Sequence, residues 1–354
     1  MEFSEIESKN LNFYAPRFEI IINGENIFYK GVEIVRVTVK NTLTGPDDFD
    51  ITINNPELKW LEDPIFQIGN EIEIRMGYGG QLTTMIVGEI SALSPSFSSS
   101  GPQQMGIRGF DLLKSLQRGD KFRSWENLPD FVIAGIVALE HKLIPDGIEP
   151  TFTIHPKVMQ NGENDFDFLK KRARENGFEM FVDLRTLYFR RPKVIKDTIT
   201  TLTLGKTLTS FTPEINLANK PSKVTVRGWD PRFKKEIVGT AGSGQELGLE
   251  LKRQSASQII KKLYGEVERS IREEPVYSQD EAEKRAKSVL DNSSDQFIKG
   301  SGECVGIPQF RAGRYINLNG LGEKLSMKYY LEETTHTIDT SGYQTKFSVK
   351  GNAI

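Results

Sequence analysis

One β-strand pattern occurs twice in this sequence, near either end of the chain. In each copy an aromatic residue, a glycine and two apolar strand positions follow one another at the same spacing, and these positions lie 244 residues apart in the two copies. The two glycines that follow the strand positions lie 243 residues apart. The matched positions are Phe66, Gly69, Gly77 and Gly79 in the first copy and Phe310, Gly313, Gly320 and Gly322 in the second. Two unrelated β-hairpins would share the alternation of apolar residues, but they would not share this ordered series of glycines. The chain is therefore predicted to carry one β module twice.

The shared positions have physical reasons. Alternating apolar residues face a core, and a Gly-x-Gly sequence permits a sharp turn between strands where φ is positive. We therefore expect residues 67–109 and 311–351 to superpose as equivalent strands, with Gly69 on Gly313 and Gly77 on Gly320.

The period of the apolar residues divides the chain into three parts. Residues 17–110 alternate with period two between turn signals, which is typical of half-buried antiparallel strands. From about Ser124 the period becomes helical, with helices expected over 129–143 and 166–176, and strands return after Pro213. We predict a mainly β fold with an α+β middle segment: a tube-like β-barrel module at 1–115, a small α+β domain at 116–213, and a second, related barrel module at 214–354.

The second module contains a helical and loop insertion at about 239–300. Small residues from Gly239 to Gly244 indicate a loop, and Ser278 with Glu281 predicts the capping box of a helix. Between these features Leu247, Leu249 and Leu251 alternate within a polar stretch that cannot bury enough apolar surface to fold alone. We expect a docking segment that becomes ordered when a partner pairs with it as a strand. An ordinary surface loop is the alternative.

Composition excludes several classes of function. The 46 basic residues nearly balance the 48 acidic ones, so no global field favours a nucleic acid or an anionic membrane. Cys304 is the only cysteine, which excludes an intrachain disulfide and suits a reducing cytoplasm. The first residues have no signal-peptide pattern, and no apolar run is long enough to cross a membrane. A modest basic run is expected to be a solvated surface and not a nucleic-acid groove: Lys114, Arg118, Lys121 and Arg123.

No group of residues demands catalysis. Gly239 and Gly244 have the spacing of a phosphate-binding loop, but the lysine that such a loop requires does not follow them. The histidines are isolated, so surface or interface positions without a metal are expected for His141, His155 and His336. Glu163, Asp165 and Asp167 lie at a predicted helix start, capped by Asn164 or Asp165, where carboxylates favour the helix dipole. We predict no enzymatic activity, no catalytic residue, no cofactor and no metal.

Four stretches of the chain resemble a known family. They begin with Phe13-Tyr-Ala-Pro-Arg-Phe18, Asn164-Asp-Phe-Asp-Phe-Leu169, Lys223-Val-Thr-Val-Arg-Gly-Trp229 and Gly306-Ile-Pro308. In this order and spacing they are similar to the phage late control gene D proteins, which are baseplate hubs of contractile tails. They are also similar to the N-terminal part of the VgrG spike proteins of type VI secretion. The resemblance spans nearly the whole chain.

This resemblance implies a homotrimer in which three chains supply six similar modules. A six-fold inner tube protein could stack on one side of such a ring and a three-fold spike on the other. Because the sequence ends at Ile354, soon after the second module, the spike is expected to be a separate protein. Other baseplate proteins are further expected partners. The chain would be made in the cytoplasm and become part of a tail or injection particle.

Two other classes of function remain as alternatives. One is a carbohydrate- or ligand-binding β protein of a tail tip or cell surface, which exposed aromatic residues along a groove would favour. The other is a cell-wall hydrolase, which the absence of a convincing acid–base pair opposes. A phage, a tailocin and another contractile injection system are all compatible with the sequence.

Overall fold

The computed structural model describes residues 15–97, 101–192, 198–230, 233–249, 253–272, 276 and 278–354. Strands dominate this part of the chain, and one 13-stranded sheet contains strands from both ends of the sequence. The predicted mainly β fold with an α+β middle segment is confirmed. Among the described strands, the ladder of hydrogen bonds runs from one edge to another without closing, so the two halves are open sheets and not closed barrels.

The first half of the sheet alternates buried and exposed residues as predicted. Ile72, Ile74 and Met76 are fully buried in its core, and the polar residues between them are not. Its strands are β1 (Pro16–Ile22), β2 (Glu25–Asn26), β3 (Ile34–Thr42), β4 (Asp48–Asn54), β5 (Glu71–Tyr78), β6 (Gln81–Ser96) and β7 (Gln104–Asp111). Short helical turns connect them: η1 (Ile27–Lys30), η2 (Pro56–Leu58), α2 (Lys59–Glu62) and η3 (Pro64–Phe66).

The second half has its own core, in which Phe310, Ile316 and Tyr329 are fully buried. Its elements are β13 (Thr198–Thr203), β14 (Leu208–Ile215), β18 (Ile298–Val305), β19 (Tyr315–Asn319), α7 (Gly322–Leu325), β20 (Lys328–Asp339) and β21 (Gly342–Gly351). Five strands lie in the order β19-β20-β21-β18-β14, and the first half has five in the order β5-β6-β7-β4-β3, with every neighbouring pair antiparallel.

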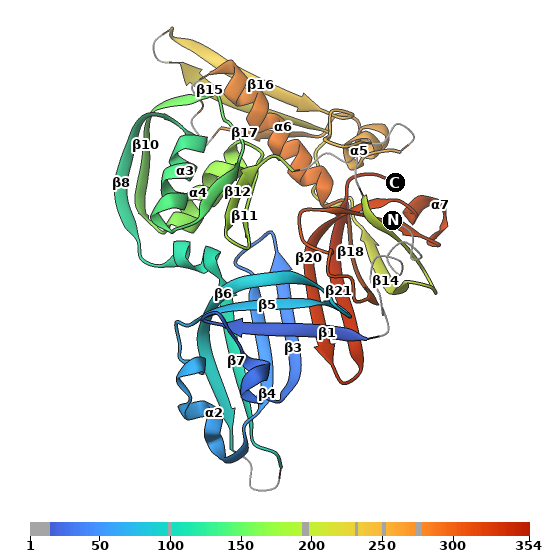
Figure 1. Ribbon diagram of the computed structural model, residues 1–354. Coiled ribbons are helices and arrows are strands. Elements are labelled where there is room, and N and C mark those ends of the chain that lie inside the picture. Colours follow the sequence, from blue (N-terminus) through green and yellow to red (C-terminus); the bar gives the residue numbers. More distant parts are fainter. Residues whose placement is uncertain are drawn as a thin grey trace.

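One strand belongs to both halves. The start of β20 pairs with β19, and residues 333–338 of β20 pair with residues 37–42 of β3. We call this ladder the β20–β3 joint. Figure 1 shows it where the red strands of the second half lie beside the blue strands of the first.

The middle segment packs two helices against small sheets. Its elements are η4 (Leu112–Gln117), β8 (Lys121–Pro129), α3 (Asp130–Glu140), β9 (Ile144–Ile148), β10 (Ile154–Glu163), α4 (Asp165–Glu175), β11 (Glu179–Asp183) and β12 (Thr186–Arg190). The two predicted helices are confirmed as α3 and α4, and the Asn164 side chain caps α4 by accepting a hydrogen bond from Asp167 N at 2.8 Å. The three-part division stays a proposal, but its second boundary, after Pro213, falls inside β14, and both β13 and β14 pair with strands of the second half.

A small layer at one end of the molecule is formed by β15 (Lys223–Asp230), β16 (Lys235–Gly242), β17 (Glu268–Ile271) and α6 (Gln279–Asp295), so it begins before the expected insertion at about 239–300 (Figure 1). Helix α5 (Ala256–Tyr264) lies in the same stretch of the chain but packs against the core of the second half. Ser278 caps α6 as predicted, by accepting a hydrogen bond from Glu281 N. The prediction of a loop from Gly239 was wrong, because residues 239–242 are the end of β16. A Cβ on Gly239 would overlap the backbone of Ala282, so the close approach of α6 requires this glycine.

Candidate functional site

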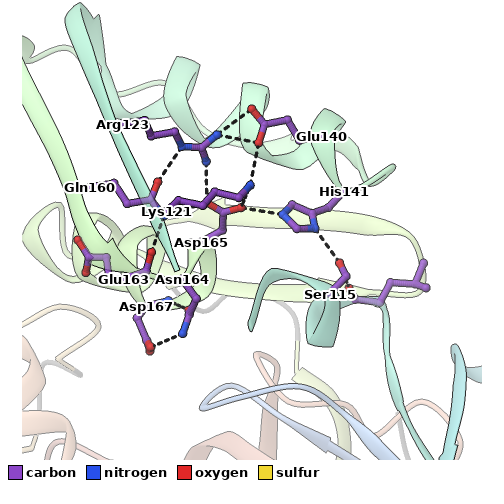
Figure 2. A network of polar contacts seen from close by, with 11 residues as sticks. Ser115, Lys121, Arg123, Glu140, His141, Gln160, Glu163, Asn164, Asp165 and Asp167 are labelled. Atoms are coloured by element: carbon purple, nitrogen blue, oxygen red, sulfur yellow. Dashed lines mark hydrogen bonds and ion pairs between the residues drawn. The ribbon is translucent and has the colours of Figure 1, made fainter. Parts of the chain in front are cut away.

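A dense polar cluster surrounds Asp165 in the middle segment (Figure 2). The Asp165 side chain is 1% exposed, and its carboxylate accepts hydrogen bonds from Lys121 Nζ and Arg123 Nη2 at 2.6 Å each. Gln160 Nε2 donates to the same carboxylate at 3.0 Å and His141 Nε2 at 2.7 Å. The carboxylate therefore has four side-chain donors.

Pairing of strands explains why these residues meet. Arg123 on β8 lies opposite Gln160 on β10, so both side chains are on the same face of this two-stranded sheet. Asp165 begins α4 directly after β10, and His141 follows the last residue of α3. The cluster thus ties β8, β10, α3 and α4 together.

The charges around Asp165 decide its ionisation. Burial alone would raise the pKa of Asp165, but hydrogen bonds from His141, Lys121 and Gln160 and the charge of Arg123 outweigh burial and hold this pKa below its usual range. Glu140 accepts further hydrogen bonds from Arg123 Nη1, at 2.9 and 2.8 Å, and from Lys121 Nζ at 3.2 Å. Both cations are therefore shared by two carboxylates.

Ser115, His141 and Asp165 have the composition of a hydrolase triad. Ser115 Oγ lies 3.0 Å from His141 Nδ1, and it also donates a hydrogen bond to Leu112 O at 2.8 Å. In a triad, histidine takes the serine proton and an unshared carboxylate stabilises the resulting imidazolium. Here the single hydroxyl proton bonds to the backbone, and Lys121 and Arg123 already neutralise Asp165. The geometry favours a structural ion-pair cluster.

The prediction of a solvated basic run was wrong in part, and the prediction for the histidines was wrong. Arg118 is exposed and Lys114 is half-buried, whereas Lys121 and Arg123 are half-buried in the Asp165 cluster and do not form a solvated surface. The histidines are internal: His336 is fully buried, His155 is buried and His141 is half-buried. Their polar partners lie on other elements, as when His155 Nε2 lies 3.1 Å from Asp130 Oδ2, so the residues directly beside each histidine gave no sign of them.

The aromatic and first glycine positions of the repeat have the same geometry in both halves. Phe66 and Phe310 are buried. Gly69 and Gly313 both have positive φ, of 93° and 81°. Gly69 N donates to Ile90 O at 2.8 Å and Ile90 N to Asn70 O at 3.0 Å, while Gly313 N donates to Leu331 O and Leu331 N to Arg314 O, both at 2.9 Å.

The other glycines of the repeat lie in different turns. Gly77 is inside β5, and a Cβ there would overlap the backbone of Gln81 across the hairpin. Gly320 follows β19 with a φ of 80°. Gly79 and Gly322 both have positive φ, but Gly79 turns directly into β6 and Gly322 begins α7. The equivalence of Gly77 with Gly320 stays a prediction.

The predicted docking segment is partly within the described residues. Leu247 and Leu249 are half-buried, and Leu251 lies outside the described residues. Leu247 N donates to Asp291 Oδ1 at 2.8 Å, and Leu247 O accepts from Asn352 Nδ2 at 2.7 Å. Docking of a partner by this segment stays a prediction.

Metal-binding clusters and membrane-spanning helices are both absent from the described residues. Within the ranges given above, no three or more histidine, cysteine or acidic side chains are grouped so that they could hold a metal ion. No helix in the described part of the chain has both the length and the apolar character that crossing a bilayer takes.

Comparison with known proteins identifies a family. The family model of the Alg8 N-terminal domain matches residues 15–340, which is most of the sequence. The chain belongs to the Alg8 N-terminal domain family. This family differs from the late control gene D family that the sequence resembles, so that finer resemblance stays a prediction. No curated protein matches the chain.

Solved structures share the fold of this Alg8 N-terminal domain family member. The 43 kDa tail protein of prophage MuSo2 from Shewanella oneidensis is 15% identical with a TM-score of 0.72, over 95% of this chain and 98% of that chain. A tail protein from Neisseria meningitidis MC58 is 14% identical with a TM-score of 0.70, over 96% and 97%. The c3393 protein of E. coli, a component of the type VI secretion system with structural similarity to the T4 bacteriophage tail proteins gp27 and gp5, is 13% identical with a TM-score of 0.57, over 93% and 76%.

Proposed function

We propose that this chain is a structural baseplate hub of a contractile phage tail or a phage-tail-like particle, and that three copies form a ring. The ring would join a six-fold inner tube to a three-fold spike. The observation that carries the proposal is the β20–β3 joint, at which two halves with the same strand order continue one sheet within a single chain.

Matching irregularities support a common origin of the two halves. A β-bulge lies between Ile90 and Ala92 on β6, and another lies between Leu331 and Glu333 on β20. β3 and β14 also share a bulge: it falls between residues 34 and 36 in one and between residues 208 and 210 in the other. Bulges that arose independently have no reason to occupy the same strand and the same register twice.

Repetition of the joint gives the ring. β6 corresponds to β20 in the repeated strand order, and β14 corresponds to β3. If β6 of one copy pairs with β14 of the next, each copy adds two modules, and three copies give six similar modules with three-fold symmetry. Six modules suit a six-fold tube, and the three-fold axis suits a spike.

The fold supports the setting of this ring. Phage tail proteins and a type VI secretion component share it, which favours a place in an assembled particle among other baseplate proteins. A connector needs no catalytic site, and the neutralised Asp165 carboxylate supports a structural and not an enzymatic role for its cluster.

Native mass spectrometry tests the stoichiometry. The purified full chain, measured over a concentration series, should give trimers as the largest discrete species, and hub released from particles should contain three copies. A ring of six copies would contradict the proposal. So would a series of species that grows beyond three, because that would indicate an open filament.

A further inference from the structure

We propose that the joint between copies is formed by the free edge of β6 in one copy and β14 in the next, in the register of the β20–β3 joint. This inference rests on the proposed ring and names its contacts. The shared bulges align residues 92–96 of β6 and Phe97 with 333–338 of β20, and residues 211–216 with 37–42. The register of the β20–β3 joint then places Ala92 opposite Asn216 and Phe97 opposite Phe211.

Both edges are open in the single chain. β14 pairs with β18 on one side and ends the path of the sheet on the other. β6 pairs with β5 up to Glu89, and Ile90 bonds to Gly69 and Asn70, so beyond Ile90 only the side facing β7 is paired among the described residues. β20 has the same arrangement, except that there β3 occupies the side that is open on β6.

Exposure of apolar side chains agrees with this register. Ile68, Phe97 and Ile215 are 61%, 66% and 45% exposed. The residues at the equivalent positions of the formed joint are buried: Ala312, Ile338 and Asn41 are 7%, 4% and 7% exposed. Ala312 N donates to Asn41 Oδ1 at 2.5 Å, so in the proposed joint an Ile68–Ile215 apolar contact would replace this hydrogen bond. Burial of three such side chains would stabilise association.

A hollow lies beside β6 at the position that β3 and the residues after it occupy beside β20. It has a volume of about 250 Å³ and is lined by residues that include Ile68, Gly69, Ile90 and Ser91. At the equivalent place beside Gly313, Leu43 donates its N–H to Glu332 O at 3.1 Å and its Cδ2 lies 3.5 Å from the position of a Cβ on Gly313.

Leu217 corresponds to Leu43 and follows β14 in a similar local turn. Thr44 N donates to Thr42 Oγ1 at 3.2 Å, and Ala218 N donates to Asn216 Oδ1 at 2.8 Å. The Leu217 side chain packs against the second-half core of its own chain, and its N–H would donate to Ser91 O of the neighbouring copy. A second copy of this chain is thus the occupant that the hollow and the open edge of β6 fit.

One pair of residues weakens this joint relative to the one within the chain. Pro95 of β6 is equivalent to His336 of β20, and Pro213 of β14 is equivalent to Val39 of β3. His336 and Val39 are paired, so Pro95 and Pro213 would face each other in the joint between copies. Neither proline has an N–H to donate, so the joint between copies has two fewer possible donors.

Disulfide trapping tests the register. Thr38 Oγ1 and Thr337 Oγ1 lie 3.4 Å apart across the β20–β3 joint, and the equivalent residues are Thr212 and Ser96. The full chain with Ser96→Cys and Thr212→Cys should form covalent dimers and trimers on mild oxidation. The pair Thr38→Cys and Thr337→Cys is the matched control and should cross-link only within one chain. Cys304 is buried and should not react.

A shifted pair, Ser94→Cys with Thr212→Cys, controls for random collision. The matched pair should cross-link roughly tenfold faster, because a disulfide requires Cα atoms within about 7 Å. Equal rates would overturn the proposed joint, and if native mass spectrometry still gave trimers the ring would stand with another interface. Covalent products that extend beyond three copies would support the joint but contradict the closed ring.

Discussion

His336 is fully buried in the second half of the sheet, with Nε2 donating to Phe310 O at 2.8 Å and Nδ1 lying 3.0 Å from Tyr343 Oη. Burial lowers its pKa from 6.5 to about 4. Between these two pH values the unfolded state binds the proton and the folded state does not. His336 therefore leaves the free energy of unfolding unchanged above pH 6.5 and lowers it as the pH falls toward 4.

The first prediction follows from this pKa. When the pH is lowered from about 7.5 to about 5, His336 should reduce the free energy of unfolding by about 2 kcal/mol. His336→Gln cannot titrate, so urea unfolding at both pH values should give a smaller loss for this variant. The same loss in both proteins would show that His336 does not carry this pH dependence.

Two glycines of β16 allow a matched test of helix packing. Gly239→Ala should destabilise the fold by about 3 kcal/mol, because the new methyl group would overlap backbone atoms of α6, which cannot change rotamer as a side chain can. Gly242→Ala should change stability by no more than about 0.5 kcal/mol, since nothing lies within 4 Å of the position that a Cβ on Gly242 would take. Thermal unfolding of both variants checks this, and similar melting temperatures would contradict it.

The first turn of α4 carries two carboxylates with different roles. Asp165→Ala should cost about 3–5 kcal/mol, because it leaves Lys121 and Arg123 without a buried partner. Asp167→Ala should cost no more than about 1 kcal/mol, since the Asp167 side chain is exposed and its carboxylate bonds to Asn164 Nδ2 at the surface. Chemical denaturation of both variants measures the difference.

Acid should reveal the same carboxylate. The pKa of Asp165 is depressed in the folded protein, so its stabilisation is present above the pKa of the unfolded side chain and is lost as the pH falls through the lower, folded value. Asp165→Ala should therefore lose less stability than the natural protein on acidification below about pH 4. Parallel losses would contradict the role assigned to this cluster.

Elements with local signals could be predicted from the sequence, and those fixed by distant partners could not. Asn164 and Ser278 cap the helices that follow them, and a cap depends on residues only a few positions away. Gly239 is required by a helix much later in the chain, so its composition was mistaken for that of a loop. The partners of Asp165 lie between 5 and 44 residues away on separate elements, which a search for short motifs does not detect.

At the scale of the whole molecule, the repeat was visible but its joint was not. Thr38 and Thr337, which face each other in this joint, are 299 residues apart. The sequence around either residue does not predict its pairing with the other. The glycine pair at 69 and 313 has matching backbone bonds because both glycines end the same turn before a strand. Once the fold is known, the free edges follow from comparison of its two halves.

The facing prolines give a prediction at this scale. Pro213→Val introduces the residue found at the equivalent position 39, and its N–H could reach Pro95 O of the next copy. One added hydrogen bond should tighten association by about threefold to tenfold. Sedimentation equilibrium can compare it with Thr212→Val, which keeps an existing N–H and should have a smaller effect. An unchanged or weaker association of Pro213→Val would contradict the register.

The strand shared by the two halves also affects the thermodynamics of assembly. Separate bodies lose translational and rotational entropy each time they associate. Independent modules would lose this freedom at every joint of a ring, whereas a chain in which β20 is already paired with β3 has formed every second joint before it meets another copy. Fusion of the modules through β20 therefore allows a weak joint, such as one with two facing prolines, to close a ring at concentrations at which separate modules would remain apart.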